Sequence, residues 1–202
     1  MSTILTVKKM AVVKHNLITQ GLSGTLGGTI VFRQVGNRTI VSTPPGEQTD
    51  PPSAAQLAHR QRFQEAALYA KGQLQDPALK EEYRLAGEHR SKPTPAFAIA
   101  VADFMEAPDI HEIDLSDYHG DPGDTIRVRV TDNFRVDEVR IRITGADGTA
   151  VENGQAVQQQ NAIDWVYTAT AANASLTGDK IIVQALDLPG NLTEQERIVE
   201  AN

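Results

Sequence analysis

The residues best suited to hold a metal ion lie close together within residues 111–124, a stretch with two histidines and four aspartates. Carboxylate oxygens are the ligands that hard cations such as Ca²⁺ prefer. The D-x-[DN]-x-[DN]-G order of a calcium-binding EF-hand is absent, however. The alternative is an acidic turn in which aspartates accept hydrogen bonds from nearby backbone amides. We predict no metal site and no cofactor, and keep as candidate ligands Asp114, Asp117, Asp121 and Asp124.

A second stretch to test for chemistry is GLSGTLGG, with glycines at positions 21, 24, 27 and 28. Glycine-rich loops bind phosphate when they join a strand to a helix and carry a lysine. This stretch has no lysine and continues into the strand-like run Thr29-Ile30-Val31-Phe32. We therefore interpret it as a flexible bend, or as a close backbone approach to a neighbouring segment.

Catalytic motifs are missing from the rest of the chain. There is no Cys, which excludes thiolate catalysis, disulfides and Cys-ligated zinc. The motifs G-x-S-x-G and H-E-x-x-H do not occur. Because catalysis needs a nucleophile, a base and an orienting group held together, we expect a protein that is not an enzyme.

Residues 1–108 begin with segments whose sequence is typical of β-strands. Residues 29–43 predict a hairpin, because TIVFRQ and RTIVST flank Gly36-Asn37, a pair that tolerates positive φ in a tight turn. Neither face of this hairpin is cleanly polar. It should therefore pair with another strand, a helix or another subunit.

About three helices should follow the hairpin. Ser53 precedes a helix over about 54–74, and Gln56 stands at the capping-box position three residues later. Asp76 caps a second helix, with Pro77 at its first position, and this helix runs to about Gly87. The apolar run AFAIAVADFM at 96–105 predicts a third, heavily buried helix.

From Ile110 onward the hydrophobic period becomes two, which is typical of half-buried strands. Ile and Val alternate with Arg127, Arg129, Arg140 and Arg142, and we expect these arginines to face outward and pair with acids on adjacent strands. Short strands separated by turns such as DPGD and GADG predict an immunoglobulin-like β-sandwich.

Charge changes at the same place as the pattern. Residues 1–108 carry 12 Lys and Arg against 9 Asp and Glu, whereas residues 109–202 carry 7 against 17. The sequence therefore predicts two domains. An α+β module of hairpin and helices over 1–108 docks to a partner, and an all-β sandwich spans 109–202.

The basic half carries the residues that we expect at a partner interface. Its net charge of +3 is far below that of dedicated nucleic-acid-binding domains, and the acidic half would repel phosphate. We therefore predict protein partners, namely subunits of a larger assembly with self-association into a homo-oligomer, and no nucleic acid. The predicted interface residues are Gly24, Gly27, Phe32, Arg33, Arg38, Arg60 and Arg62.

The N-terminal part of the sequence also resembles a poorly characterised family of small proteins from Bacteroidota and their phages. The resemblance covers roughly residues 20–107 and includes a Gly-spaced start, a VFRQ strand and an A-Q-x-x-x-R-x-x-F helix. The matching residues are Gly24, Gly27, Phe32, Arg38, Pro44, Gln56, Arg60 and Phe63. The second half is similar to immunoglobulin-like domains of bacterial surface and phage-tail proteins. The resemblance implies no catalytic residues and points, by analogy, to phage-like particles or contractile injection systems.

Two functions follow as expectations. The first is a non-enzymatic structural protein of a phage-like particle or contractile injection system, with the N-terminal module docked and the sandwich exposed. The alternative is a binding module that recognises carbohydrate or a surface protein through the sandwich loops. Its aromatic candidates are Tyr118, Phe134, Trp165 and Tyr167.

No targeting segment is recognisable at the start of the sequence. Lysines interrupt the apolar patches of MSTILTVKKMAVVKHNLITQG, whereas a secretory signal needs an unbroken apolar core. No apolar run approaches the length of about 18 residues that would span a bilayer. We expect cytoplasmic synthesis without a signal peptide and no membrane insertion, the chain then joining a released or envelope-attached particle.

Overall fold

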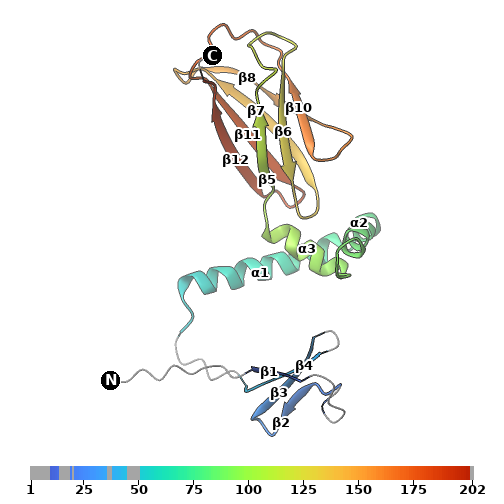
Figure 1. The fold of residues 1–202 in the computed structure, drawn as a ribbon. Coiled ribbons are helices and arrows are strands. Elements are labelled where there is room, and N and C mark those ends of the chain that lie inside the picture. The colour runs from blue at the N-terminus through green and yellow to red at the C-terminus, as the bar shows by residue number, and fades with distance from the viewer. Residues whose placement is uncertain (1–9, 14–18, 20, 36–37, 45–50, 201–202) are drawn as a thin grey trace, which may run out of the picture. The chain divides into compact units, whose positions relative to one another are not determined.

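Three helices and three antiparallel sheets form the chain in the computed structural model, which describes residues 10–13, 19, 21–35, 38–44 and 51–200 (Figure 1). These elements divide into two compact units, Met1–Ser53 and Ala54–Asn202. The first unit holds one sheet. The second holds all three helices and the other two sheets.

The sheet of the first unit has the strand order β1-β4-β3-β2. Its strands are β1 (Met10–Val13), β2 (Gly24–Leu26), β3 (Ile30–Val35) and β4 (Arg38–Ser42). The predicted hairpin is present as β3 and β4, and its turn at residues 36–37 lies outside the described residues. The glycine-rich stretch is not simply a bend. Gly24 begins strand β2, and Gly27 and Gly28 take φ values of +57° and +67° in the turn to β3, where most other residues would be strained.

The helices match their predicted positions closely. They are α1 (Ala54–Gln73), α2 (Pro77–Glu88) and α3 (Ala96–Met105). Asp76 caps α2 as predicted, because its Oδ1 accepts the backbone amide of Ala78 at 2.8 Å. One apolar cluster joins the three helices, formed by Ala66, Ala70, Tyr83, Ile99, Ala100 and Val101.

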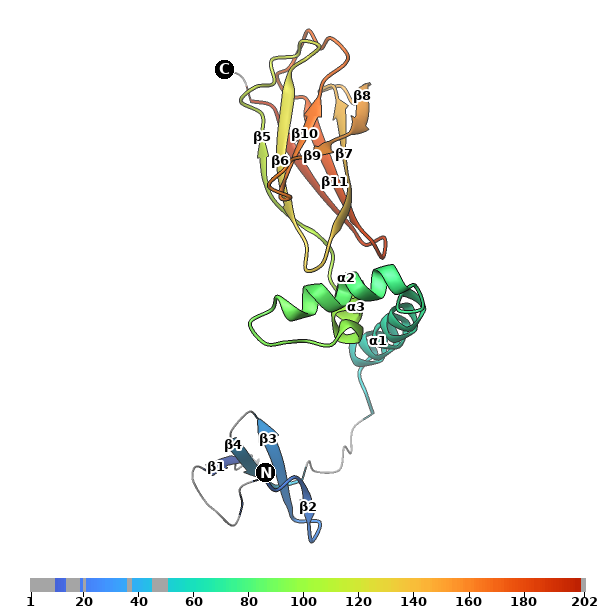
Figure 2. The ribbon, with the colours of Figure 1, turned by 90° about the vertical axis from the view of Figure 1, so that its right-hand side faces the viewer.

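The remaining strands form a two-layer antiparallel sandwich (Figures 1 and 2). One sheet has the order β5-β6-β10-β9, from β5 (Asp109–Asp114), β6 (Thr125–Thr131), β10 (Asp164–Thr168) and β9 (Val157–Gln158). The other has the order β12-β11-β7-β8, from β12 (Leu192–Ile198), β11 (Lys180–Asp187), β7 (Val136–Thr144) and β8 (Ala150–Gln155).

The predicted alternation of side chains positions the core of the sandwich. On β6, Ile126, Val128 and Val130 are buried between partly exposed neighbours, and β7 and β11 repeat the pattern. Strands β8 and β9 were not predicted. Their sequences, AVENGQ and VQ, contain no run of alternating apolar residues. Both strands lie at sheet edges, and most of their side chains are exposed.

The helices pack against the sandwich, so the predicted division at residue 108 is not where the compact units separate. The Phe134 ring, from the β6–β7 loop, stacks on Tyr83 of α2 with ring centroids 4.1 Å apart. Arg135 pairs with Glu82 at 2.9 Å. Asn191, from the β11–β12 loop, donates to the backbone carbonyls at the end of α3. Residue 108 marks only the change from helices to strands.

The charge changes at both boundaries, by a smaller step at residue 53 and by a larger one at residue 108. Residues 1–53 carry 5 Lys and Arg against 2 Asp and Glu, whereas residues 54–202 carry 14 against 24. The helical segment 54–108 is itself neutral, with 7 of each sign. The basic unit is therefore the sheet alone, and the acidic character comes from the sandwich.

Candidate functional site

The sheet of the first unit has two faces of different character, which its pairing register defines. Directly paired residues of an antiparallel sheet point to the same side. Phe32 pairs with both Gly24 and Val41, and Leu26 pairs with Ile30. The uncharged face therefore carries Ala11, Leu26, Ile30, Phe32, Gln34, Thr39 and Val41. The arginine face carries Val12, Thr25, Val31, Arg33, Val35, Arg38, Ile40 and Ser42.

The described residues of the unit leave apolar side chains exposed on both faces. Among the side chains described there, only Thr39 is buried. Leu26 is 63% exposed and Ile30 38% on the uncharged face, and Val12 and Val35 are 50% and 45% exposed on the arginine face. A sheet normally packs one face on a core. This one presents apolar side chains to solvent on both sides.

Polar contacts, and not a core, join the described strands to the preceding chain. Gln34 Nε2 donates to Thr39 Oγ1 at 2.9 Å and to the carbonyl oxygen of Leu22 at 2.8 Å. Thr39 Oγ1 in turn donates to the carbonyl oxygen of Thr19 at 3.2 Å. These bonds link residues 19 and 22 to the side chains of β3 and β4.

The predicted interface residues divide between the two units. Gly24, Gly27, Phe32, Arg33 and Arg38 belong to the sheet, with Phe32 on one face and the two arginines on the other. Arg60 and Arg62 belong to α1 in the second unit. There Arg62 donates to the carbonyl oxygen of Met105 at 3.3 Å and to Asn191 Oδ1 at 3.4 Å, so it helps to hold the helices against the sandwich.

The prediction that four aromatic rings line ligand-binding loops is wrong for these side chains. Tyr118, Trp165 and Tyr167 are buried in the core of the sandwich. The hydroxyl groups of the two tyrosines have hydrogen-bond partners there, since Tyr167 donates to Glu152 at 2.9 Å and Tyr118 accepts from Asn173 at 3.2 Å. Phe134 is stacked on Tyr83 at the junction with the helices. None of the four offers a free ring to a sugar.

The acidic stretch that we tested for calcium behaves as a turn. Asp124 Oδ2 accepts the amides of His119 at 2.7 Å and Asp121 at 3.0 Å, and these backbone hydrogen bonds lower the pKa of Asp124. Asp114 is bound to Arg127, and this hydrogen bond is the main reason that its pKa falls to about 2. Across the described residues, no three His, Asp or Glu side chains gather in a way that could hold a metal ion.

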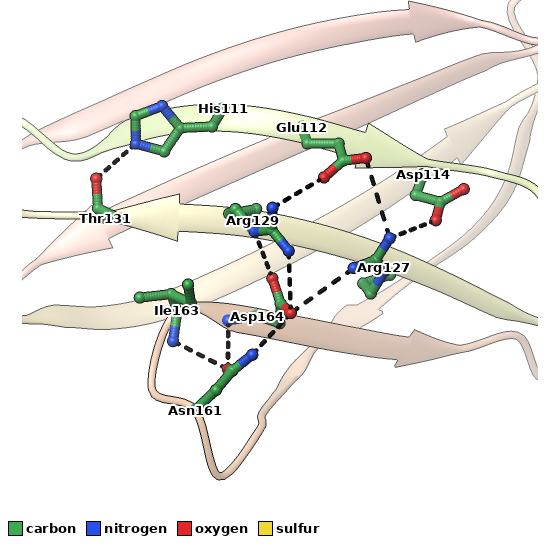
Figure 3. A network of polar contacts seen from close by, with 9 residues as sticks. All are labelled: His111, Glu112, Asp114, Arg127, Arg129, Thr131, Asn161, Ile163 and Asp164. Carbon is green, nitrogen blue, oxygen red and sulfur yellow. Dashed lines mark hydrogen bonds and ion pairs between the residues drawn. The ribbon is translucent and has the colours of Figure 1, made fainter.

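The arginines on β6 lie in a network of ion pairs on the outer face of the sandwich (Figure 3). Arg127 bonds Asp114 at 2.7 Å, and Arg129 bonds Asp164 at 2.9 Å. Glu112 lies 3.9 Å from Arg127 and 3.5 Å from Arg129. Two guanidiniums face three carboxylates, so the network is already neutralised and offers no site for phosphate.

The other two outward arginines differ from the prediction. Arg140 pairs at 2.6 Å with Glu138 of its own strand and not with a neighbouring strand. Arg142 forms no ion pair with a described residue. Pairing across strands is thus confirmed for β6 but not for β7.

Several buried aspartates were not predicted from the sequence, and Asp103 is the one whose pKa changes most. Asp103 of α3 is fully buried, and burial raises its pKa to about 7. The hydroxyl of Tyr83 donates to its Oδ2 at 2.6 Å. The available signal was a lone aspartate within the apolar run AFAIAVADFM, where a charged residue needs a partner.

Comparisons with known proteins identify no relative by sequence. No family model matches the chain, and no curated protein matches it. Among solved structures, the chain is similar to a crystallised engineered protein at 22% identity and a TM-score of 0.33. That match covers 47% of this chain and 20% of the engineered protein, so the chain spans only about a fifth of its length.

A second similar structure is that of CopC from Methylosinus trichosporium OB3b, at 15% identity and a TM-score of 0.33. This match covers 44% of this chain and 87% of the CopC chain. Both TM-scores are too low to support an inference about fold or function. Within the described residues, none of the helices combines the length and the apolar character needed to cross a membrane.

Proposed function

We propose that this protein is a non-enzymatic structural component of a larger assembly, of the phage-like particle or contractile injection type. The N-terminal sheet docks into the assembly, and the sandwich stays exposed. The observation that carries this proposal is that apolar side chains are exposed on both faces of the sheet, in which Thr39 is the only buried side chain described. The resemblance of residues 20–107 to phage-associated proteins gives the class of assembly.

The energetics of the sheet favour a docked state. Burying a Val, Leu or Ile side chain contributes about 1.5–3 kcal/mol. Val12, Leu26, Ile30 and Val35 lack a substantial part of this contribution because they are 38–63% exposed. Ordering each residue costs about 1–2 kcal/mol in backbone entropy, which hydrogen bonds alone rarely offset. A partner that covers the faces supplies the missing stabilisation.

The strand order supports an immunoglobulin-like module for the sandwich. With β5, β6, β7, β8, β9, β10, β11 and β12 taken as strands A, B, C, C′, D, E, F and G, the two sheets read A-B-E-D and G-F-C-C′. This is the arrangement of immunoglobulin domains that carry a C′ strand. The chain departs from antibody domains because it has no cysteine pair and because Trp165 lies on the E-like strand β10.

The sandwich suits an exposed position. Its apolar core is buried, and its outer arginines on β6 are neutralised in the chain itself. Residues 109–202 carry a net charge of −10, which favours solubility. The alternative function, recognition of carbohydrate through aromatic loops, loses its main residues because those rings are in the core or at the helix junction.

The proposal can be tested by native mass spectrometry of the purified full chain together with cryo-electron microscopy of particles from its source. We expect the chain in the particles, with density for the sandwich on the outside and the N-terminal sheet against another subunit. A chain that is strictly monomeric and absent from every particle would refute the proposal.

A further inference from the structure

We propose that the junction between the helices and the sandwich is a pH-dependent joint, which is closed while the buried carboxyl group of Asp103 is protonated and opens when that group ionises. Opening means that the three helices separate from the sandwich while the strands of the sandwich stay paired. This inference concerns the second unit alone and does not rest on the assembly role.

Asp103 lies where the helices meet two loops of the sandwich. Its side chain accepts the hydroxyl of Tyr83 at 2.6 Å, and the Tyr83 ring stacks on Phe134 of the β6–β7 loop. Its backbone carbonyl accepts from Asn191 Nδ2 of the β11–β12 loop at 3.2 Å. The same Nδ2 donates to Asp187 Oδ2 at 2.7 Å, at the end of β11. The aspartate is therefore part of the contact surface between the helices and the sandwich.

The surroundings of Asp103 favour the neutral acid over the carboxylate. The residue is fully buried, and its Oδ1 has no hydrogen-bond partner among the described residues. A buried carboxylate is stable only where a cation or several hydrogen-bond donors compensate its charge. Tyr83 supplies a single donor. The ionised form of Asp103 is therefore poorly compensated as long as the junction is closed.

The charged groups of the sandwich side strengthen this preference. Two further carboxylates raise the pKa of Asp103, namely Asp132 of the β6–β7 loop and Asp187 of β11. Arg135 is the cation that lowers this pKa, but its guanidinium is bound to Glu82 of α2 at 2.9 Å. Ionisation of Asp103 would therefore add a third negative charge to a cluster whose cation is already paired.

On the helix side, the groups that face Asp103 are neutral. The hydroxyls of Tyr83 and Tyr69 are hydrogen-bonded to each other at 3.2 Å, and burial is the first cause that raises the pKa of each. Burial raises the pKa of Asp187 as well, but its carboxylate accepts both the amide and the side chain of Asn191. Asp103, whose pKa burial raises to about 7, is thus the least compensated acid of the cluster.

Opening of the junction would return Asp103 to water, where its ordinary pKa of 3.8 applies. The opened form then holds the proton less tightly than the closed form between pH 4 and pH 7. The equilibrium constant for opening should therefore rise about tenfold per pH unit in this range and become constant above pH 7. The apolar core of the sandwich lies within residues 110–199, so its strands can stay paired during opening.

The first test is hydrogen–deuterium exchange of the full chain at pH 5 and pH 8, corrected for the intrinsic exchange rate at each pH. Detached helices lose Phe134 and Leu188 from their apolar cluster, and short helices without such packing are marginal in water. We expect the protection of α2 and α3 amides to be about 100-fold lower at pH 8 than at pH 5. Amides of β7 and β11 should change little. Equal loss of protection in helices and strands, or no loss in either, would overturn the proposal.

Two matched variants assign the pH dependence to one carboxyl group. Asp103→Asn keeps an acceptor for Tyr83 but does not ionise, so the protection of α2 and α3 should no longer depend on pH. Asp109→Asn changes an exposed aspartate of β5 and should keep the dependence of the parent. An unchanged pH dependence in Asp103→Asn would overturn the proposal.

A second test does not require that Asp103→Asn folds. The chain has no native cysteine, and Ala100 of α3 and Ala185 of β11 are both fully buried. The alkylation rates of Ala100→Cys and Ala185→Cys by iodoacetamide are measured at pH 5 and pH 8 and divided by the rate of a cysteine peptide at the same pH. The normalised rate should rise about 100-fold at position 100 and stay constant at position 185. A parallel rise at both positions, or no rise at position 100, would contradict the joint.

Discussion

The hydroxyl of Tyr83 donates a 2.6 Å hydrogen bond to the buried Oδ2 of Asp103, which ties α2 to α3. The other carboxylate oxygen of Asp103 has no hydrogen-bond partner among the described residues. Burial is the largest cause of the raised pKa of Asp103, and the nearby carboxylates Asp132 and Asp187 raise it further. The pKa of Tyr83 is raised as well, first by burial and then by its bond to Asp103.

This pairing makes the stability of the second unit depend on pH. The pKa of Asp103 is about 7 in the fold, against an ordinary value of 3.8, so the folded state holds its proton more tightly. Its contribution to stability is complete below pH 4 and is lost as pH rises towards 7 and above. Asp103→Asn removes the buried charge but keeps an acceptor for Tyr83. We expect the free energy of unfolding of this variant, measured with urea, to be about 1–3 kcal/mol higher than that of the parent at pH 8. At pH 4 the two free energies should be equal.

Asp114→Asn is a control of opposite sign. The pKa of Asp114 is lowered to about 2, mainly by its bond to Arg127, so its contribution is present above pH 4 and is lost as pH falls through 2. This variant should be slightly less stable than the parent at pH 7 and equal to it near pH 2. A loss at pH 8 for Asp103→Asn would contradict our account of the junction.

Two glycines near helix ends should respond oppositely to alanine. A Cβ on Gly87 would lie 2.0 Å from the carbonyl oxygen of Thr94, so the loop before α3 would have to move. Gly87→Ala should cost about 2–4 kcal/mol. A Cβ on Gly72 in α1 would meet nothing within 4 Å, so Gly72→Ala should add about 0.5–1 kcal/mol. Fluorescence of Trp165, the only tryptophan, can be recorded during urea unfolding of both variants.

The position of the domain boundary can be tested with two fragments. Residues 54–202 keep the contacts between the helices and the sandwich, whereas residues 109–202 lose the partners of Phe134, Arg135 and Asn191. We expect both to be soluble, but the shorter fragment should melt about 5–15 °C lower. Equal melting temperatures would instead favour a division at residue 108.

The ion pairs of the sandwich should differ in importance. Asp164 accepts from Arg129 and Asn161 and is nearly buried, so Asp164→Ala leaves several donors without an acceptor. The urea concentration at the midpoint of unfolding should be clearly lower for this variant than for the parent. Arg140→Ala removes only an exposed pair with Glu138 and should leave the midpoint within error. Similar midpoints for the two variants would show that the network in Figure 3 contributes nothing to stability.

Local patterns predicted the elements of this fold better than they predicted its contacts. Alternation of Ile and Val with Arg located β6 and β7, and Asp76-Pro77 located the start of α2, because both signals depend on neighbours in the chain. Strand β8 was not predicted because its sequence is polar, and it forms a strand only through pairing with β7. The docking of Phe134 on Tyr83 joins residues 51 positions apart, and no local pattern encodes it. The aromatic residues were misplaced for the same reason.

The central claim, that the N-terminal sheet needs a partner, is tested most directly by hydrogen–deuterium exchange of the full chain. Samples should be compared at a dilution where the chain is monomeric and in the assembled state. We predict that the amides of β3 and β4 exchange almost as fast as an unfolded peptide in the monomer and at least about 100-fold more slowly in the assembly, while β7 and β11 are protected in both. Amides of β3 and β4 protected as strongly as those of β11 in a strictly monomeric sample would contradict the account.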